Sequence, residues 1–170
     1  MAVLRITKHG EPVLKKISAP VDYAALKPEL PKLLRGMWAA MNSVRGVGLA
    51  APQIGLNIRL AVIDVRPEGK SQKLVLINPE IVALDGQINE EEGCLSLPGV
   101  YAKVARAQCA RIRALDEHGK PYEMSGTGLL ARAFQHEIDH LDGKLFIDRL
   151  EFAHKLRVLS VIKDLKPTWP

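Results

Sequence analysis

The chain has few cysteines and no long run of apolar residues. Only Cys94 and Cys109 are cysteines among its 170 residues, a count more typical of a protein kept reduced in the cytosol than of a disulfide-rich secreted domain. The longest apolar candidate, LRVLSVIKDL at 156–165, is interrupted by charges and is shorter than the roughly 20 residues that span a bilayer. The N-terminal sequence has neither the apolar segment nor the cleavage site of a secretory signal. We therefore expect no membrane association.

Internal repeats, low-complexity tracts and Gly/Ser-rich linkers are also absent from the sequence. Hydrophobic residues make up 47% and charged residues 25% of the chain, as in soluble globular proteins. A chain of this length fits one domain that buries about two-thirds of its extended surface. We therefore predict a single domain over residues 1–170. The net charge of +5 favours solubility, and it would favour an anionic partner only where the basic residues cluster.

The spacing of apolar residues predicts three helices. They are expected at 30–44, from about Gly128 to 142, and at 152–165, where apolar side chains recur with the helical period. Pro31 suits the first turn of the first helix. Gly143 is expected to end the second helix as a glycine cap.

The middle of the chain predicts strands. Segments 58–65 and 73–84 are rich in β-branched and aliphatic residues, and 101–116 alternates, with a slip near Cys109 that suggests a bulge. The turn at 116–123 leads into another short strand. Strands in the middle and helices at both ends predict an α+β fold. We expect mixed or antiparallel strands packed around the helix at 128–142, with an N-terminal and a C-terminal helix outside them.

The segment QHEIDH at 135–140 predicts a metal site. On a helix His136 and His140 lie one turn apart on one face, so both imidazoles can reach one ion. Glu137 follows the first histidine, and the flanking residues are apolar, which argues against two ordinary solvated histidines. Metalloprotease helices show the same pattern. The pattern does not identify the third protein ligand.

Cys94 is the candidate for that ligand. It follows a glycine and precedes a proline-containing turn in EGCLSLPG. A lone cysteine is more often a small buried hydrophobe, but with the histidine pair it would complete a three-ligand site that keeps a position open for water. Such an open site is catalytic rather than structural. Cys109, inside an alternating strand, is expected to have no such role.

Three sequence blocks resemble the motifs of the peptide deformylases. They are GVGLAAPQIG at 46–55, EGCLSLPG at 92–99 and QHEIDHLDG at 135–143, and their order and spacing match the family. The opening HGEPVLKKISAPV is also similar, so the resemblance spans essentially the whole chain. It implies a metal-dependent hydrolase that removes the formyl group from N-formylmethionine at the start of newly synthesised proteins. Nascent peptides would then be the substrates, and formate a product.

The resemblance also implies roles for individual residues. Glu137 would carry a proton from water to the leaving amine, while the Gln53 side chain and the Leu95 backbone N–H would hold the developing oxyanion. Gly48 would pair with the substrate backbone. The side of the site that receives the methionine would be lined by Val47, Leu129, Ala133 and the stem of Arg132.

Two acidic residues are candidates for supporting roles. Glu92 would accept a hydrogen bond from the outer nitrogen of a ligand histidine and thereby fix its tautomer. Asp139 is expected to form a salt bridge, with Arg106 as the candidate partner. Tyr101 marks a departure, because many relatives carry an arginine there that contacts the peptide backbone. This difference leaves the chemistry intact and bears on peptide preference.

A thiolate with two imidazoles suits zinc, iron(II), nickel or cobalt. The resemblance implies Fe²⁺ in the cell, with Zn²⁺, Ni²⁺ or Co²⁺ possible in purified protein. It also implies a bacterial cytoplasmic enzyme; a mature organellar enzyme without its transit peptide would have the same sequence features. The basic residues of the last helix are either a solvated face or a surface that docks the ribosome: Lys155, Arg157, Lys163 and Lys166. No sequence-specific recognition of nucleic acid is expected.

Two other interpretations remain open from the sequence. An endoprotease of the ordinary HExxH kind would cleave internal peptide bonds and would not need Cys94. A metal-stabilised binding protein on an inactivated deformylase fold would bind the ion without turnover. The presence of both Glu137 and Gln53 disfavours the binding protein, because an abandoned site needs neither residue.

Overall fold

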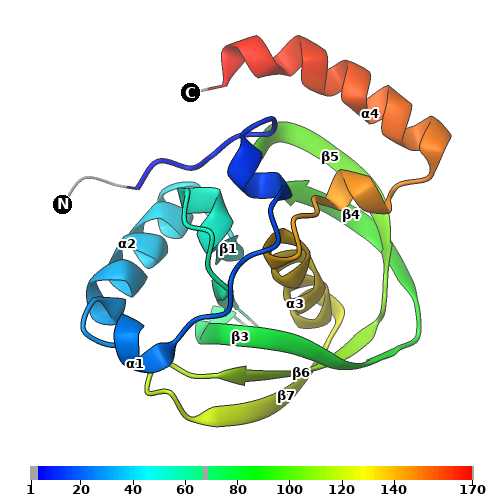
Figure 1. The fold of residues 1–170 in the computed structure, drawn as a ribbon. Coiled ribbons are helices and arrows are strands. Elements are labelled where there is room, and N and C mark those ends of the chain that lie inside the picture. Colours follow the sequence, from blue (N-terminus) through cyan, green and yellow to red (C-terminus); the bar gives the residue numbers. More distant parts are fainter. Residues whose placement is uncertain (1–3, 67–68, 170) are drawn as a thin grey trace.

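The computed structural model describes residues 4–66 and 69–169 and has a mixed α+β architecture (Figure 1). The α-helices are α1 (Tyr23–Leu26), α2 (Leu30–Ser43), α3 (Gly128–Leu141) and α4 (Phe152–Leu165). The strands are β1 (Gly48–Ala50), β2 (Leu60–Val65), β3 (Gln72–Asp85), β4 (Ile88–Cys94), β5 (Leu97–Arg106), β6 (Cys109–Leu115) and β7 (Pro121–Thr127). Short 3₁₀ turns are η1 (Pro12–Lys15), η2 (Ala51–Ile54), η4 (Phe146–Arg149) and η5 (Lys166–Thr168).

The strands form two antiparallel sheets. A five-stranded sheet has the order β1-β2-β3-β6-β7, and β4 and β5 form a separate two-stranded hairpin. Helices α2 and α3 lie on opposite sides of the larger sheet, and α3 lies between this sheet and the hairpin (Figure 1). Helix α4 packs on the outer side of the hairpin. The predicted α+β class with antiparallel strands and a C-terminal helix is confirmed.

Strand β2 shows how the core is built. Its side chains are all buried because both faces of the strand are covered. Leu60 and Val62 belong to the apolar cluster under α2, whereas Ala61, Ile63 and Val65 belong to the cluster under α3. Alternate residues of a strand point to opposite faces. A strand covered on both faces is therefore apolar along most of its length, and β2 is interrupted only by Asp64, which accepts a hydrogen bond from the Ser71 hydroxyl.

The long strand predicted over 101–116 was wrong, and there is no bulge at Cys109. The chain instead leaves the hairpin after Arg106 and enters the larger sheet at Cys109. The side chain of Gln135 on α3 stabilises this crossing, because its amide accepts from the backbone N–H of Ala107 and donates to the carbonyl of Ala107, both at 3.0 Å. Register shifts occur in β3 instead, between Ile77 and 83.

Gly143 follows α3, as predicted for a glycine cap. Its φ of +71° lies in the left-handed region, where L side chains are strained. A Cβ there would also lie 2.7 Å from the carbonyl oxygen of Lys15. The glycine therefore lets the end of α3 lie directly against the N-terminal segment, beside the Ser18 N–H bond to the carbonyl of Leu141.

No helix within residues 4–66 and 69–169 is long and apolar enough to cross a membrane.

We predict that Phe134→Ala lowers the free energy of unfolding by about 3–5 kcal/mol. Phe134 is fully buried in the cluster between α3 and the larger sheet, so the truncation leaves a cavity that its neighbours fill only in part. Urea denaturation at fixed metal content measures the effect. The matched control is Phe152→Ala, since the Phe152 side chain is 78% exposed and its loss should change stability by less than about 0.5 kcal/mol. Equal losses from both variants would contradict this assignment of the core.

Candidate metal centre

Helix α3 and the tip of the β4–β5 hairpin bring the predicted metal ligands together. His136 and His140 lie on successive turns of α3, and Cys94 is the last residue of β4. The His140 Nε2 atom is 3.3 Å from the Cys94 Sγ and 3.2 Å from the His136 Nε2. All three donor atoms lie within 4.8 Å of one another. The fold thus brings Cys94 next to two histidines that follow it by 42 and 46 positions in the sequence.

The spacing of these donors fits a bound divalent ion. Metal–nitrogen distances near 2.0–2.1 Å and a metal–sulfur distance near 2.3 Å place the ligand atoms of a tetrahedral site about 3.3–3.6 Å apart. The separations of 3.3 Å and 3.2 Å between the His140 Nε2 and its two neighbours are close to these values. Two imidazole nitrogens at this distance need either a proton or a metal ion between them, because their lone pairs repel. The set of one sulfur and two nitrogens suits Zn²⁺, Fe²⁺, Ni²⁺ or Co²⁺.

Glu92 holds His136 in the required orientation. Its Oε2 is 3.1 Å from the His136 Nδ1, so the Nδ1–H donates to the carboxylate and the Nε2 lone pair faces Cys94 and His140. This confirms the predicted contact. Burial opposes ionisation of Glu92, but hydrogen bonds from His136 and Arg106 outweigh it and lower the pKa of Glu92 to about 2. The carboxylate is therefore charged at neutral pH.

The two histidines differ in their surroundings. Burial lowers the pKa of both rings, and at His140 it prevails, so the His140 pKa is well below its ordinary value and the ring is neutral. At His136 the adjacent Cys94 and Glu92 outweigh burial and raise the pKa well above its ordinary value. Surroundings that favour a proton on His136 also favour a metal cation beside it.

The predicted salt bridge between Asp139 and Arg106 is present and extends further than expected. Arg106 forms two bonds to Glu92, at 2.9 and 3.0 Å, and a third to Asp139 at 2.5 Å. Arg149 of η4 also donates to Asp139. The side chains of Arg106, Glu92 and Asp139 are almost fully buried. The sequence analysis missed Arg149, because a surface arginine in a short turn carries no distinguishing pattern.

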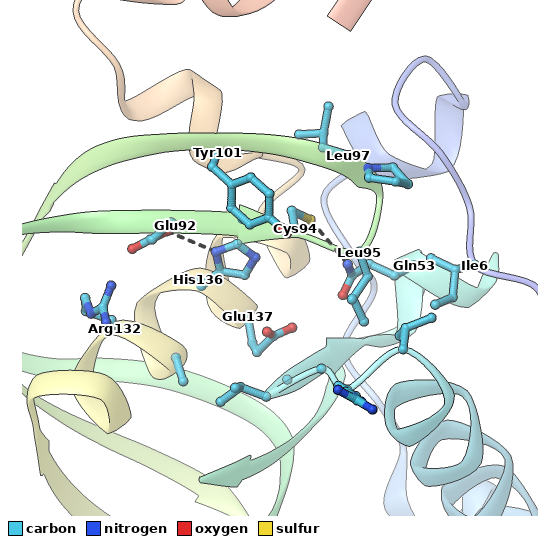
Figure 2. A pocket seen from close by; sticks show the side chains of 18 of the residues that line it. Ile6, Gln53, Glu92, Cys94, Leu95, Leu97, Tyr101, Arg132, His136 and Glu137 are labelled. Carbon is cyan, nitrogen blue, oxygen red and sulfur yellow. Dashed lines mark hydrogen bonds and ion pairs between the residues drawn. The ribbon is translucent and has the colours of Figure 1, made fainter. Parts of the chain in front are cut away.

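Glu137 points into the cavity rather than toward the metal-ligand candidates (Figure 2). It is only 3% exposed, and its Oε2 has no hydrogen-bond partner within the described part of the chain. Burial raises the pKa of Glu137 to about 7. Its carboxylate lies directly against Gly48, where a Cβ would be 2.7 Å from the Glu137 Cδ. Gly48 thus makes room for the carboxylate, a role that the sequence analysis did not anticipate.

Gln53 lies on η2 and is 1% exposed. Its Oε1 accepts from the backbone N–H of Ala50 at 2.9 Å, and its Nε2 lies 3.5 Å from the Cys94 Sγ and 3.3 Å from the Ser96 Oγ. Leu95 lies at the hairpin tip between Cys94 and Ser96. The predicted oxyanion donors thus flank the sulfur of Cys94.

A cavity of about 550 Å³ opens at this site, within the size range of small-ligand pockets. Its walls include all eight residues predicted for catalysis and substrate binding: Val47, Gly48, Gln53, Leu95, Leu129, Arg132, Ala133 and Glu137. Cys94 and His136 also line it, whereas His140 lies beneath them and is 1% exposed.

The cavity wall also includes Tyr101 and, from segments that the sequence analysis did not single out, Ile6, Lys8 and Arg45. Tyr101 is 63% exposed, and its ring covers the backbone of Gly93, where a Cβ would lie 2.6 Å from a ring carbon. Figure 2 shows this ring above His136, beside the site. Nothing in the local sequence marks residues 6–8 as cavity residues; their place follows from the way the N-terminal segment crosses the site.

Known proteins with similar sequences and structures share one family. The family described as polypeptide deformylase matches residues 3–155. The chain is 44% identical to a peptide deformylase of Elusimicrobium minutum, over 99% of each chain, and 45% identical to one of Alkalilimnicola ehrlichii, over 97% of this chain and 92% of that one.

Solved structures agree. A peptide deformylase from Legionella pneumophila superposes with a TM-score of 0.90 at 43% identity, over 98% of this chain and 97% of that one. A peptide deformylase from Synechococcus elongatus in complex with actinonin superposes with a TM-score of 0.86 at 42% identity, over 93% of this chain and 86% of that one. With its three motifs joined in one cavity, the chain belongs to the peptide deformylase family.

Proposed function

We propose that this chain removes the formyl group from N-formylmethionine at the start of newly synthesised proteins and releases formate. One observation carries the proposal: the donor atoms of Cys94, His136 and His140 converge beside the buried carboxylate of Glu137, on the wall of one cavity. Family membership supports the same activity. We further propose that residues 1–170 form one catalytic domain.

Hydrolysis of a formamide requires a nucleophile, a proton carrier and donors for the oxyanion. A divalent ion held by Cys94, His136 and His140 would act as a Lewis acid that makes water nucleophilic near neutral pH. Glu137 is one residue from a ligand but directed into the cavity, so its carboxylate can take a proton from the attacking water and return it to the leaving amine.

The oxyanion donors flank the reacting centre. We propose that the Gln53 Nε2 and the Leu95 backbone N–H donate to the formyl oxygen as it gains negative charge. Such a donor typically lowers the barrier by about 3 kcal/mol. Gln53 needs little reorganisation for this task, because both ends of its buried amide already have partners.

The methionine side chain of the substrate would occupy the apolar part of the cavity. Val47 and Leu129 are 36% and 48% exposed, and Ala133 lies beside them in the wall. The Arg132 guanidinium donates a 3.0 Å hydrogen bond to the carbonyl of Glu91, which holds the aliphatic stem of Arg132 in place along the cavity. Substrate that covers Val47 and Leu129 removes apolar surface from water, which favours binding. The Gly48 backbone would pair with that of the substrate.

We propose Fe²⁺ as the ion in the cell and the cytoplasm as the location; free thiols at both Cys94 and Cys109 fit a reducing compartment. We also propose that α4 docks the ribosome, the source of formylated chains. The exposed Arg157, Lys163 and Lys166 support this docking, because ribosomal RNA is anionic.

Purified protein loaded with Fe²⁺ or Ni²⁺ should release formate from formyl-Met-Ala-Ser. The assay follows formate with a coupled dehydrogenase under anaerobic conditions, and metal-free protein serves as the control. Absence of formate at full metal occupancy would reject the proposed function. Cleavage of internal bonds in N-terminally blocked peptides would support the endoprotease interpretation instead.

We expect Cys94→Ala to abolish stoichiometric metal binding, because it removes one of three protein ligands. Metal content is measured by mass spectrometry after anaerobic purification. Cys109→Ala is the matched control: this second free thiol lies on β6 and does not line the cavity, so its removal should leave one ion per chain. Full metal occupancy in Cys94→Ala would show that the sulfur is not a ligand.

Glu137→Gln should keep the metal and lower kcat by about 10²–10⁴-fold, since the amide cannot carry the proton. The control is Glu90→Gln on β4, an exposed residue outside the cavity wall, which should leave kcat unchanged. Turnover in the wild type that metal-loaded Glu137→Gln loses excludes the non-enzymatic binding protein, because that interpretation predicts no turnover even in the wild type. Normal turnover in Glu137→Gln would exclude Glu137 as the proton carrier.

A further inference from the structure

Ser96 contacts the proposed oxyanion donor without reaching the cavity. The residue is fully buried, and it is missing from the cavity wall although its neighbours Leu95 and Leu97 are part of it. Its Oγ is 3.3 Å from the Gln53 Nε2. A hydroxyl in this position cannot touch substrate, but it can determine how the Gln53 amide is held.

The direction of the Gln53 amide follows from its partners. The backbone N–H of Ala50 must meet an acceptor, so the amide oxygen faces Ala50 and the NH₂ group faces the hairpin tip. This NH₂ group has two N–H donors. The Ser96 Oγ accepts from one of them at 3.3 Å, and the other donates to the Cys94 Sγ at 3.5 Å, on the side where the site opens.

We propose that Ser96 is a positioning residue that fixes the Gln53 amide so that its second N–H points at the reacting formyl oxygen. The inference rests on the proposed function and specifies how one of its donors is held. Without the Ser96 hydroxyl, one N–H of a buried amide would lose its acceptor. The amide would then turn to find another partner, and the second N–H would no longer be aligned when charge develops on the substrate.

Backbone hydrogen bonds to the N-terminal segment hold Gln53 and Ser96 in position relative to each other. In the N-terminal segment, the Thr7 N–H donates to the carbonyl of Gln53 at 2.8 Å, and the His9 N–H donates to the carbonyl of Ser96 at 2.9 Å. One short stretch of chain therefore spans the turn that carries Gln53 and the turn that carries Ser96. The hydroxyl meets the amide because both turns are fixed to the same segment.

A double-mutant cycle of Ser96→Ala and Gln53→Leu tests the proposal. Ser96→Ala should lower kcat about tenfold or more with little change in KM or in the pH profile, less than the roughly 10²–10³-fold of losing the donor itself. The double variant should be no slower than Gln53→Leu alone, since Ser96 acts only through Gln53. Additive losses, or wild-type kcat in Ser96→Ala, would overturn the proposal.

Two further variants control for folding. Ser18→Ala removes another buried serine hydroxyl, one that has no hydrogen-bond partner within the described residues, and should keep wild-type kcat. Ser96→Cys retains the size of the side chain with a weaker acceptor, so its kcat should lie between those of wild type and Ser96→Ala. A Ser96→Cys variant as slow as Ser96→Ala would contradict a graded role of the acceptor.

A measurement without turnover separates this proposal from the proposed function. In Zn²⁺-loaded protein the Gln53 side-chain NH₂ signals, assigned by their loss in Gln53→Leu, should shift and exchange faster with water in Ser96→Ala but not in Ser18→Ala. Unchanged signals would overturn the positioning role whatever the activity. If the wild type releases no formate but the Gln53 signals shift in Ser96→Ala, the proposed function is refuted and the positioning role of Ser96 is retained.

Discussion

The guanidinium of Arg106 joins the two parts of the molecule on which the metal centre depends. It lies at the end of β5 and binds Glu92 of β4 and Asp139 of α3. Glu92 in turn binds His136. A buried ion pair of this kind does not need to stabilise the fold relative to apolar residues. Its effect is geometric: the hairpin that carries the sulfur and the helix that carries the rings are held by the same side chain.

Because this ion-pair network is buried, each of its carboxylates is paired with an arginine. A lone buried carboxylate or guanidinium would be very costly, yet Arg106 and Arg149 compensate both Glu92 and Asp139. The compensated Glu92 stays ionised. Burial raises the pKa of Glu137 to about 7, and no cation within the described part of the chain is bonded to this carboxylate. Two glutamates close in space thus differ in pKa because Glu92 accepts hydrogen bonds from His136 and Arg106, which Glu137 does not.

Helices α2, α3 and α4 and strands β2 and β3 could be predicted from the sequence pattern, because each of them buries at least part of its surface. The four-residue α1, which buries no side chain, and strands β1 and β4 were not predicted. The break at 107–108 could not be predicted, since the slip in alternation near Cys109 fits a bulge as well as a break, and the deciding contact comes from Gln135, about 28 residues away. The grouping of Cys94, His136 and His140 could be predicted, because their spacing and neighbours are unusual. The contribution of residues 6–9 and of Arg149 could not, because it depends on tertiary placement.

The site combines two kinds of support. His136, Glu137 and His140 lie within two turns of one helix, whose backbone fixes their relative positions. Gln53 lies on the short 3₁₀ turn η2 and Leu95 at the tip of the hairpin, and the N-terminal segment holds both turns through Thr7 and His9. The placement of the proposed oxyanion donors therefore depends on a segment outside the proposed catalytic residues. The α3 backbone alone can place Glu137, the proposed proton carrier. Gln53 and Leu95 lie outside that helix, so their placement requires hydrogen bonds from another segment to the turns that carry them.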